Sequence, residues 1–250
     1  MKLFWEYLKS ILIAVIAALI FRSFFFEAYK IPSSSMTPTL MIGDYLFVSK
    51  YSYGYSKHSF PIALDSIKGR FFAKQPERGD IIVFKSPHAD DDRYYIKRLM
   101  GLPGDKIHVR NAVVFINDIA VERKKVGIYH PLYKDEPQGI FDCYEERLPN
   151  GVRYNTLDAN FRFHNEFPDQ TAVYHIPQGY YFMMGDHRNR SVDSRFLSEM
   201  GFIPEENLVG KAQILFWTRD FSFWKIVTQF KLDRLFNRLI INDNTLHLSQ

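Results

Sequence analysis

Tyr94-Tyr-Ile-Lys-Arg-Leu-Met100 is predicted to form a β-strand that carries two neighbouring cations. Because side chains alternate across a strand, Lys97 shares one face with the apolar Tyr95 and Leu99, and Arg98 points to the other face. If both faces of the sheet are covered, at least one cation lies in an apolar environment, where its charged form is disfavoured. A lone lysine more often extends its amine to solvent, so the strand by itself does not identify a site.

The sequence on both sides of this strand predicts a mainly β protein. Strands are predicted at Tyr45-Leu-Phe-Val-Ser49 and at Ile81-Ile-Val-Phe84, each directly after a Gly-Asp turn, and at residues 180–184. Val109 to Val121 is predicted to form one hairpin around Asn117-Asp118. Residues 122–174 are rich in polar and aromatic side chains with weak periodicity. We therefore expect a β-rich insertion there.

Residues 3–26 are predicted to form a single transmembrane helix. Ile11 to Phe21 is uninterrupted apolar sequence, and a helix over this segment reaches across a bilayer core of about 30 Å. A cleavable signal peptide would need a small-x-small site after the apolar run, but Arg22-Ser-Phe-Phe-Phe-Glu27 follows it here. A buried core helix is the other alternative. The basic residues on the two sides of the span do not decide its orientation.

The composition excludes several classes of protein. Of the 250 residues, 46% are hydrophobic and 16% are aromatic, which excludes intrinsic disorder. The net charge of +4 is too small for a polybasic nucleic-acid-binding surface, so no nucleic acid partner is expected. Cys143 is the single cysteine and no histidine lies in a His-Glu-x-x-His arrangement, so we expect no metal and no cofactor.

Two further segments concentrate polar side chains. Pro32-Ser-Ser-Ser-Met-Thr-Pro38 follows the apolar span, and its prolines and apolar neighbours favour a fixed loop over a flexible linker. Residues 185–198 are polar and charged and follow the strand predicted at 180–184. A solvated loop is the ordinary interpretation of such a run.

Together with the Lys97 strand, these segments resemble the bacterial type I signal peptidases, which are membrane-anchored serine proteases with a Ser/Lys dyad. Ser35, directly before a methionine, resembles the nucleophile of that family, and Lys97 resembles its general base. The other family boxes are matched, in order, by Gly43-Asp-Tyr45, by Arg78-Gly-Asp80 and by the run from Gly185 to Arg195 followed by Gly201-Phe-Ile-Pro204. One stretch departs from the family pattern: His187-Arg-Asn-Arg-Ser191 stands where Asn-Arg-Asp-Asn-Ser is usual.

The resemblance also implies how the two catalytic residues work. A serine hydroxyl needs a base to attack a peptide bond, and a lysine with its ordinary pKa is neutral in only about one molecule in 2,500 at pH 7. We expect burial of Lys97 to lower its pKa. By resemblance, Ser191 hydrogen-bonds and orients the Lys97 amine. The resemblance likewise implies that the Ser33 hydroxyl and the Ser35 backbone N–H form the oxyanion hole.

Two ion pairs are implied as scaffold for this site rather than as chemistry. By resemblance, Arg98 pairs with Asp186. Asp193 likewise pairs with Arg195.

The substrates implied by the family are secretory preproteins with small-x-small cleavage sites. An extended peptide can pair with exposed strand edges, and residues 27–31 and 94–97 are the candidate edges. We expect substrate-binding residues to wall shallow apolar pockets, and these are Ile31, Pro32, Met36, Leu40, Tyr95 and Ile96. The resemblance further implies a single-pass protein of the inner (cytoplasmic) membrane, with its catalytic domain on the non-cytoplasmic side of the lipid bilayer.

The expected fold is therefore mainly β, a signal-peptidase-like β-fold behind one N-terminal transmembrane helix. We expect an anchor at 1–26, a catalytic β domain at 27–121 and 175–217, a β-rich insertion at 122–174, and a tail at 218–250. Within the tail, Lys231 to Ile241 is predicted to form an amphipathic helix. Its apolar face packs on its own domain, or the helix lies on an anionic bilayer.

Three other functions remain as alternatives. A Ser-His-Asp hydrolase would use His187, but no serine has a Gly-x-Ser-x-Gly environment. A membrane-anchored binding protein without enzymatic activity would tolerate loss of Ser35 and of Lys97. The repressor autoproteases also use serine and lysine, but they carry a DNA-binding helix pair where this chain has an apolar span.

Overall fold

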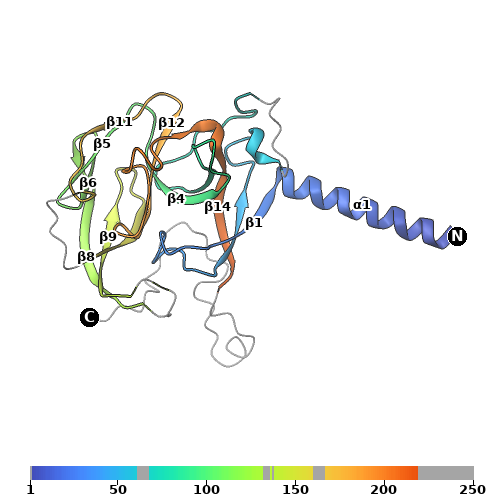
Figure 1. The fold of residues 1–250 in the computed structure, drawn as a ribbon, viewed down its shortest axis with the longest axis horizontal. Helices are drawn as coiled ribbons and strands as arrows, with labels where there is room; N and C mark the ends of the chain where they lie inside the picture. Colours follow the sequence, from blue (N-terminus) through green and yellow to red (C-terminus); the bar gives the residue numbers. More distant parts are fainter. Residues whose placement is uncertain (1, 61–67, 132–135, 137, 160–166, 219–250) are drawn as a thin grey trace.

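The computed structural model describes residues 2–60, 68–131, 136, 138–159 and 167–218. Figure 1 shows a β-rich body from which one long helix projects. The mainly β fold behind an N-terminal apolar helix is confirmed. The amphipathic helix predicted at 231–241 lies outside the described residues.

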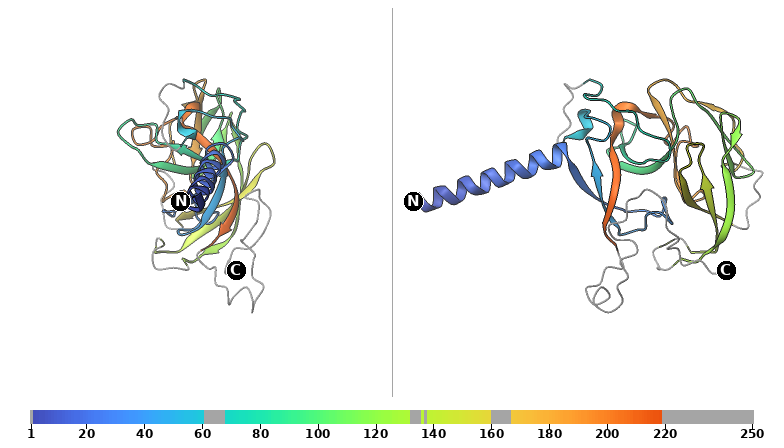
Figure 2. Two further views of the ribbon diagram at one scale, coloured as in Figure 1. Left: turned by 90° about the vertical axis from the view of Figure 1, so that its right-hand side faces the viewer. Right: turned by 180° about the vertical axis from the view of Figure 1, so that it is seen from behind.

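The projecting helix is α1, Lys2–Phe24. It is about 34 Å long at 1.5 Å per residue, and it leads away from the body in the right view of Figure 2. By length and composition it can cross a membrane, and none of its apolar stretch is buried against the rest of the described chain. Within the described part of the chain, this exposure speaks against the alternative of a buried core helix.

A seven-stranded sheet forms the part of the body next to α1. Every neighbouring pair in it is antiparallel, in the order β1-β2-β14-β3-β4-β12-β13. Its strands are β1 Phe26–Lys30, β2 Tyr45–Ser49, β3 Ile81–Lys85, β4 Tyr94–Gly101, β12 Tyr180–Met184, β13 Ile203–Pro204 and β14 Leu208–Trp217. All four strands predicted from alternation and turn signals are present, as β2, β3, β4 and β12.

This sheet curls until its first strand approaches its fifth. The rings of Tyr29 in β1 and Tyr94 in β4 have centroids 6.1 Å apart, although β2, β14 and β3 lie between these strands in the sheet. Within the described chain β1 pairs only with β2, and residues 94–97 of β4 pair only with β3, because the β12 pairing begins at Arg98. Two unpaired strand edges therefore lie near each other.

Two smaller sheets form the end of the body opposite α1 (Figure 1). The three-stranded sheet has the order β10-β9-β8, with β8 Glu122–Tyr129, β9 Phe141–Arg147 and β10 Arg153–Ala159. The four-stranded sheet has the order β11-β5-β6-β7, with β5 Lys106–Arg110, β6 Val113–Ile116, β7 Ile119–Ala120 and β11 Tyr174–His175. Two short 3-10 helices, η1 Lys57–Ser59 and η2 Glu205–Asn207, complete the described elements.

The single hairpin predicted at 109–121 is incomplete, because this segment makes two tight turns. Asn117 and Asp118 turn with φ 52° and 65°, as expected for a two-residue hairpin loop. Asn111 and Ala112 make a second such turn, with φ 51° and 61°, between β5 and β6. Alanine rarely adopts the left-handed conformation, so the sequence carries little signal for the earlier turn.

Candidate active site

The Ser35 hydroxyl, from the loop between β1 and β2, contacts the Lys97 amine of β4. Lys97 Nζ donates a hydrogen bond of 2.6 Å to Ser35 Oγ, across 62 positions of sequence. Both residues are buried, with 7% of Ser35 and 3% of Lys97 exposed. The cation of β4 that shares a face with Tyr95 and Leu99 is therefore the one that contacts the serine.

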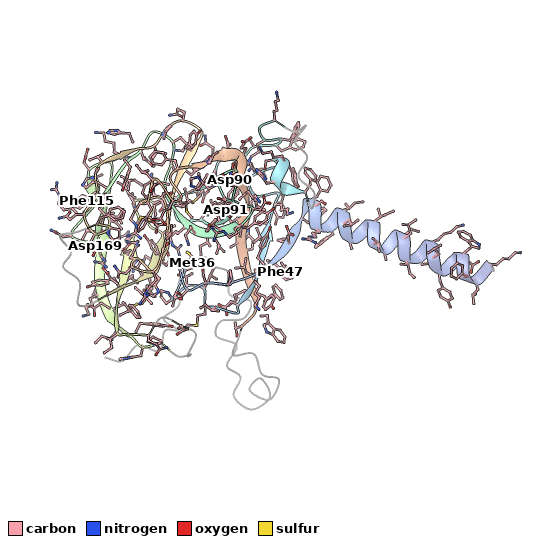
Figure 3. The ribbon with its side chains drawn as sticks, viewed as in Figure 1. Met36, Phe47, Asp90, Asp91, Phe115 and Asp169 are labelled. Carbon is pink, nitrogen blue, oxygen red and sulfur yellow. The ribbon has the colours of Figure 1, made fainter. Side chains whose placement is uncertain are left out.

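The loop that carries Ser35 is held rigidly, as its prolines and apolar neighbours predicted. The Thr37 N–H donates to the Ser34 carbonyl at 3.0 Å, and the Leu40 N–H donates to the Met36 carbonyl at 2.9 Å. Met36 and Leu40 are fully buried in the core cluster under the sheet. Figure 3 shows Met36 in the interior of the body. This anchoring fixes the nucleophile candidate against β4.

Burial lowers the pKa of Lys97 to about 8. The carboxylates of Asp193 and Asp186 oppose this shift, because a nearby negative charge favours the ammonium. At pH 7 a group with a pKa of 8 is neutral in about one molecule in ten, compared with about one in 2,500 for an unperturbed lysine. The site thus contains a hydroxyl hydrogen-bonded to an amine that loses its proton close to neutral pH.

The second cation of β4 is also buried, in an ion pair. Arg98 Nε and Nη2 donate to the two carboxylate oxygens of Asp186 at 2.8 and 2.7 Å, and both side chains are 1% exposed. Thr39 Oγ1 donates to Asp186 Oδ2 at 2.5 Å and thereby connects the Ser35 loop to this pair. A bidentate pair of this kind is strongly destabilising to break from one side, because a buried charge is left without a partner.

The other expected pair is also present. Arg195 Nε and Nη2 donate to the carboxylate of Asp193 at 2.8 and 2.9 Å, and both residues are buried. Asp193 also accepts the Gly185 N–H at 3.0 Å. A Cβ at Gly185 would collide with Ser191 Oγ and with the Ser35 carbonyl oxygen, so only glycine permits this close approach of loop 185–195 to the nucleophile.

Ser191 does not make the hydrogen bond that was expected of it. Its hydroxyl is buried and has no hydrogen-bond partner among the described residues. Among the described residues, the Lys97 amine donates to Ser35, and the Ser191 side chain instead lies against Gly185. The expected orienting contact with Lys97 is therefore not formed in this structure.

Ser33 lies at the solvent side of the site. Its side chain is exposed, and its Oγ is 3.3 Å from Ser35 Oγ. A hydroxyl beside the nucleophile can donate to an oxygen that becomes negative during attack.

The six expected substrate-binding residues are not equivalent. Three of them are core residues with 0–1% exposure and cannot wall an open pocket: Ile31, Met36 and Leu40. They are buried because they fill the space between the Ser35 loop and β2, β3 and β14. Pro32 is exposed, while Tyr95 and Ile96 are half-buried on opposite faces of β4, Ile96 against the core of the Ser35 loop and Tyr95 against Phe84.

His187 is a buried, neutral residue behind the nucleophile loop. Burial lowers its pKa to about 4, and its ring packs edge-on against Phe141 with centroids 4.7 Å apart. Its backbone N–H donates to the Ser35 carbonyl at 3.1 Å. The base hydrogen-bonded to Ser35 is therefore Lys97, which speaks against the Ser-His-Asp alternative. The neighbouring Arg190 is exposed.

Two residues that shape the site escaped the sequence analysis. Thr39 donates to Asp186, and Glu146 accepts hydrogen bonds from Arg188 of loop 185–195. Thr39 lies within the Ser35 loop and a search for polar residues there could have found it. Glu146 belongs to β9 and no local pattern distinguishes it from its charged neighbours.

Comparisons with known proteins agree on one family. The family described as "Signal peptidase, peptidase S26" matches residues 4–217. A Signal peptidase I of Rickettsia typhi is 41% identical over 226 residues, which cover 86% of this chain and 81% of the relative. A Signal peptidase I of Rickettsia felis is 38% identical over 254 residues and covers 94% and 92%. The crystal structure of a signal peptidase I from Enterococcus faecalis V583 matches 55% of this chain and 97% of its own, at 25% identity and a TM-score of 0.32.

Proposed function

This chain belongs to the signal peptidase family, peptidase S26, and from that premise we propose that Ser35 attacks the signal-peptide bond of secretory preproteins while Lys97 acts as the general base. The family makes the chain a serine peptidase that removes signal peptides. The assignment of Ser35 and Lys97 rests on one observation, the 2.6 Å hydrogen bond between a buried amine and a serine hydroxyl.

The chemistry follows from the proton inventory of this pair. Neutral Lys97 accepts the Ser35 proton as the hydroxyl oxygen attacks the scissile carbonyl carbon. The resulting ammonium donates that proton to the amine of the mature protein as the peptide bond breaks. The same amine, neutral again, then takes a proton from the water that hydrolyses the acyl-enzyme ester. The ion pairs of Arg98 with Asp186 and of Arg195 with Asp193 hold the surrounding loops in place.

The substrate is proposed to bind as an extended strand between two unpaired edges. One edge is β1 and the other is residues 94–97 of β4, and the Tyr29 and Tyr94 rings lie near each other across them. A peptide here pairs through its backbone and directs alternate side chains inward. Because the core beneath the Ser35 loop is already filled, only small side chains fit on that floor, which supports a preference for small-x-small cleavage sites.

We propose that α1 anchors the enzyme as a single-pass protein in the inner (cytoplasmic) membrane, with the body on the non-cytoplasmic side. Only one residue separates the end of α1 at Phe24 from edge strand β1. Aromatic rings gather at that exit, where Phe26 contacts Phe47 and Tyr51, and both of these are exposed. Such residues suit a membrane interface. The proposed groove therefore lies beside the bilayer from which preprotein cleavage sites emerge.

The test of this function is cleavage of a preprotein in detergent micelles across a pH series. We expect kcat/KM to rise with pH and to level off above about pH 8, because only the neutral form of Lys97 is a base and burial lowers its pKa to about 8. A matched preprotein with phenylalanine in place of the alanine before the cleavage site should stay uncut. A rate that is constant from pH 6 to pH 9 would contradict the lysine base.

Ser33→Ala should lower kcat by about 10²- to 10³-fold and change KM by less than about 2-fold, because an oxyanion donor acts mainly in the transition state. The exposed position of Ser33 means that the free energy of unfolding should not change. Ser33→Thr, which keeps the hydroxyl, is the matched control and should retain most of the activity. Normal turnover by Ser33→Ala would remove the oxyanion role.

A further inference from the structure

The buried carboxylate of Glu146 connects the three-stranded sheet to loop 185–195. Glu146 in β9 is 1% exposed and accepts two hydrogen bonds from the Arg188 guanidinium, at 2.8 and 2.5 Å. It also accepts the Tyr154 hydroxyl at 2.7 Å and the Thr156 hydroxyl at 3.3 Å. Glu146 is therefore surrounded by donors from its own sheet and from loop 185–195.

The backbones of the two segments are also joined. The Leu157 N–H of β10 donates to the Asp186 carbonyl at 2.9 Å, and the Arg188 N–H donates to the Leu157 carbonyl at 2.9 Å. This makes an isolated parallel bridge between β10 and His187. The Ala159 N–H donates to the Asn189 side chain as a third link. Loop 185–195 thus rests on the edge of the three-stranded sheet over several consecutive residues.

Arg188 is adjacent in sequence to His187, which contacts the nucleophile candidate Ser35. The His187 backbone N–H donates to the Ser35 carbonyl at 3.1 Å. The Arg188 carbonyl itself accepts Arg195 Nη2 at 2.7 Å, and Arg195 pairs with Asp193. A shift of Arg188 therefore moves the backbone contact between His187 and Ser35. It also moves the Asp193 carboxylate, whose charge acts on Lys97.

The same cluster reaches the lysine from the other side. The Tyr154 ring, whose hydroxyl donates to Glu146, lies under the Arg98 guanidinium at 4.1 Å from the ring centroid. Arg98 directly follows Lys97 in β4. Contacts from Glu146 therefore reach Arg98, which is next to Lys97 in sequence. They also reach Arg188, which is next to the residue that contacts Ser35.

The charge of Glu146 is needed to hold these groups. Arg188 is 4% exposed, and Arg123 Nε lies 3.5 Å from the same carboxylate with only 9% of its side chain exposed. Removing one partner of a buried ion pair leaves a charge without compensation, which is strongly destabilising unless the group moves toward water. Asp158 still pairs with Arg123 at 2.6 Å, so Arg188 is the cation that would be left without a carboxylate.

We propose that Glu146, whose described hydrogen bonds and ion pairs do not include Ser35 or Lys97, is a positioning residue of the reaction. It holds loop 185–195 through Arg188, and the loop holds Ser35 and Lys97 in hydrogen-bonding geometry. The role rests on the proposed serine–lysine mechanism. The three-stranded sheet is accordingly part of the support of the active site.

The test compares Glu146→Gln with Glu145→Gln, its neighbour in the same strand. Glu145 points to the other face, where it lies 3.6 Å from Arg153 and both side chains are exposed. For Glu146→Gln we expect kcat on a preprotein in detergent to fall by about 10- to 100-fold, the size of effect that small misplacements cause, with KM within about 2-fold. Glu145→Gln should match the wild type. All rates are measured well below the melting temperature of each variant.

The pH profile separates positioning from a general loss of stability. Asp193, Asp186 and Arg195 are the charged groups that act most strongly on the Lys97 pKa, and Glu146 is not among them. A displaced loop admits water to the amine, and loss of burial moves the acidic limb of kcat/KM toward higher pH. A wild-type profile together with wild-type kcat would overturn the proposal.

Two further variants keep the result interpretable. Ser35→Ala is assayed in parallel: if it still cleaves, the proposed mechanism fails, and if it is inactive while Glu146→Gln behaves as wild type, only the positioning role fails. Should Glu146→Gln not fold, Tyr154→Phe removes one donor to the carboxylate and keeps the ring under Arg98. We expect it to lower kcat several-fold and to shift the acidic limb in the same direction, and unchanged values would refute the role.

Discussion

Replacing Lys97 with methionine should lower kcat/KM for preprotein cleavage by at least about 10⁴-fold without reducing the free energy of unfolding at pH 7. Methionine has a similar length and no basic nitrogen. Among the described residues, the hydrogen-bond partners of Ser35 Oγ are Lys97 and Ser33, and a serine hydroxyl cannot replace the amine as a base. The variant therefore retains the nucleophile but has nothing to remove its proton.

The expected stability follows from the direction of the pKa shift. Burial lowers the Lys97 pKa from 10.5 to about 8, so between these pH values the unfolded chain binds more protons at this residue than the folded chain does. This lysine therefore makes the wild type more stable as the pH rises from 8 to 10.5, and below pH 8 it costs the fold about 3 kcal/mol relative to an unburied lysine. Methionine at this position removes that cost.

Urea unfolding of the wild type and of Lys97→Met at pH 7 and pH 10 measures this effect. The advantage of the variant should be largest at pH 7 and should shrink at pH 10. Lys106→Met is the control, since this lysine is exposed and lies 3.7 Å from Asp118, and it should change neither activity nor stability. Cleavage by Lys97→Met at a rate near that of the wild type would eliminate Lys97 as the base.

Ser35→Ala should be as inactive as Lys97→Met, with a loss of at least about 10⁴-fold in kcat/KM, because the covalent step has no nucleophile. The double variant should be no worse than either single variant, since two residues that act as one unit lose their joint contribution once. Ser34→Ala is the matched control in the same loop and should stay within about 3-fold of the wild type.

Comparison of Ser35→Ala with the wild type also decides between an enzyme and a binding protein. A membrane-anchored binding protein would tolerate Ser35→Ala, and substrate would be bound but not cut by the wild type. Measurable cleavage by Ser35→Ala at the normal site would assign the nucleophile to another residue.

Much of the secondary structure could be predicted because it depends on neighbours in sequence. The apolar run at 11–21 and the strands at 45–49 and 81–85 follow from local periodicity and from glycine turns. The turn at Asn111-Ala112 could not be predicted in the same way, because pairing of β5 with β6 forces alanine into a conformation that it seldom adopts.

In the candidate site, too, the residue identities follow from local sequence, whereas the contacts depend on the packing of distant segments. Ser35 and Lys97 follow from the resemblance of two short segments to the family's boxes, yet their 2.6 Å contact depends on how β4 and the Ser35 loop are packed. Packing also turned Met36 from an expected pocket wall into a core residue and left the Ser191 hydroxyl without the expected bond.

By itself, the sequence determined which chemical groups are available: a serine in a stiff loop, a lysine on a strand, and an apolar helix that precedes both. Only the tertiary structure decided that the Lys97 amine is shielded from water and that Glu146, from a distant strand, supports loop 185–195. The physical reason is that desolvation and ion pairing depend on what surrounds a group in three dimensions, and segments far apart in the chain supply those surroundings.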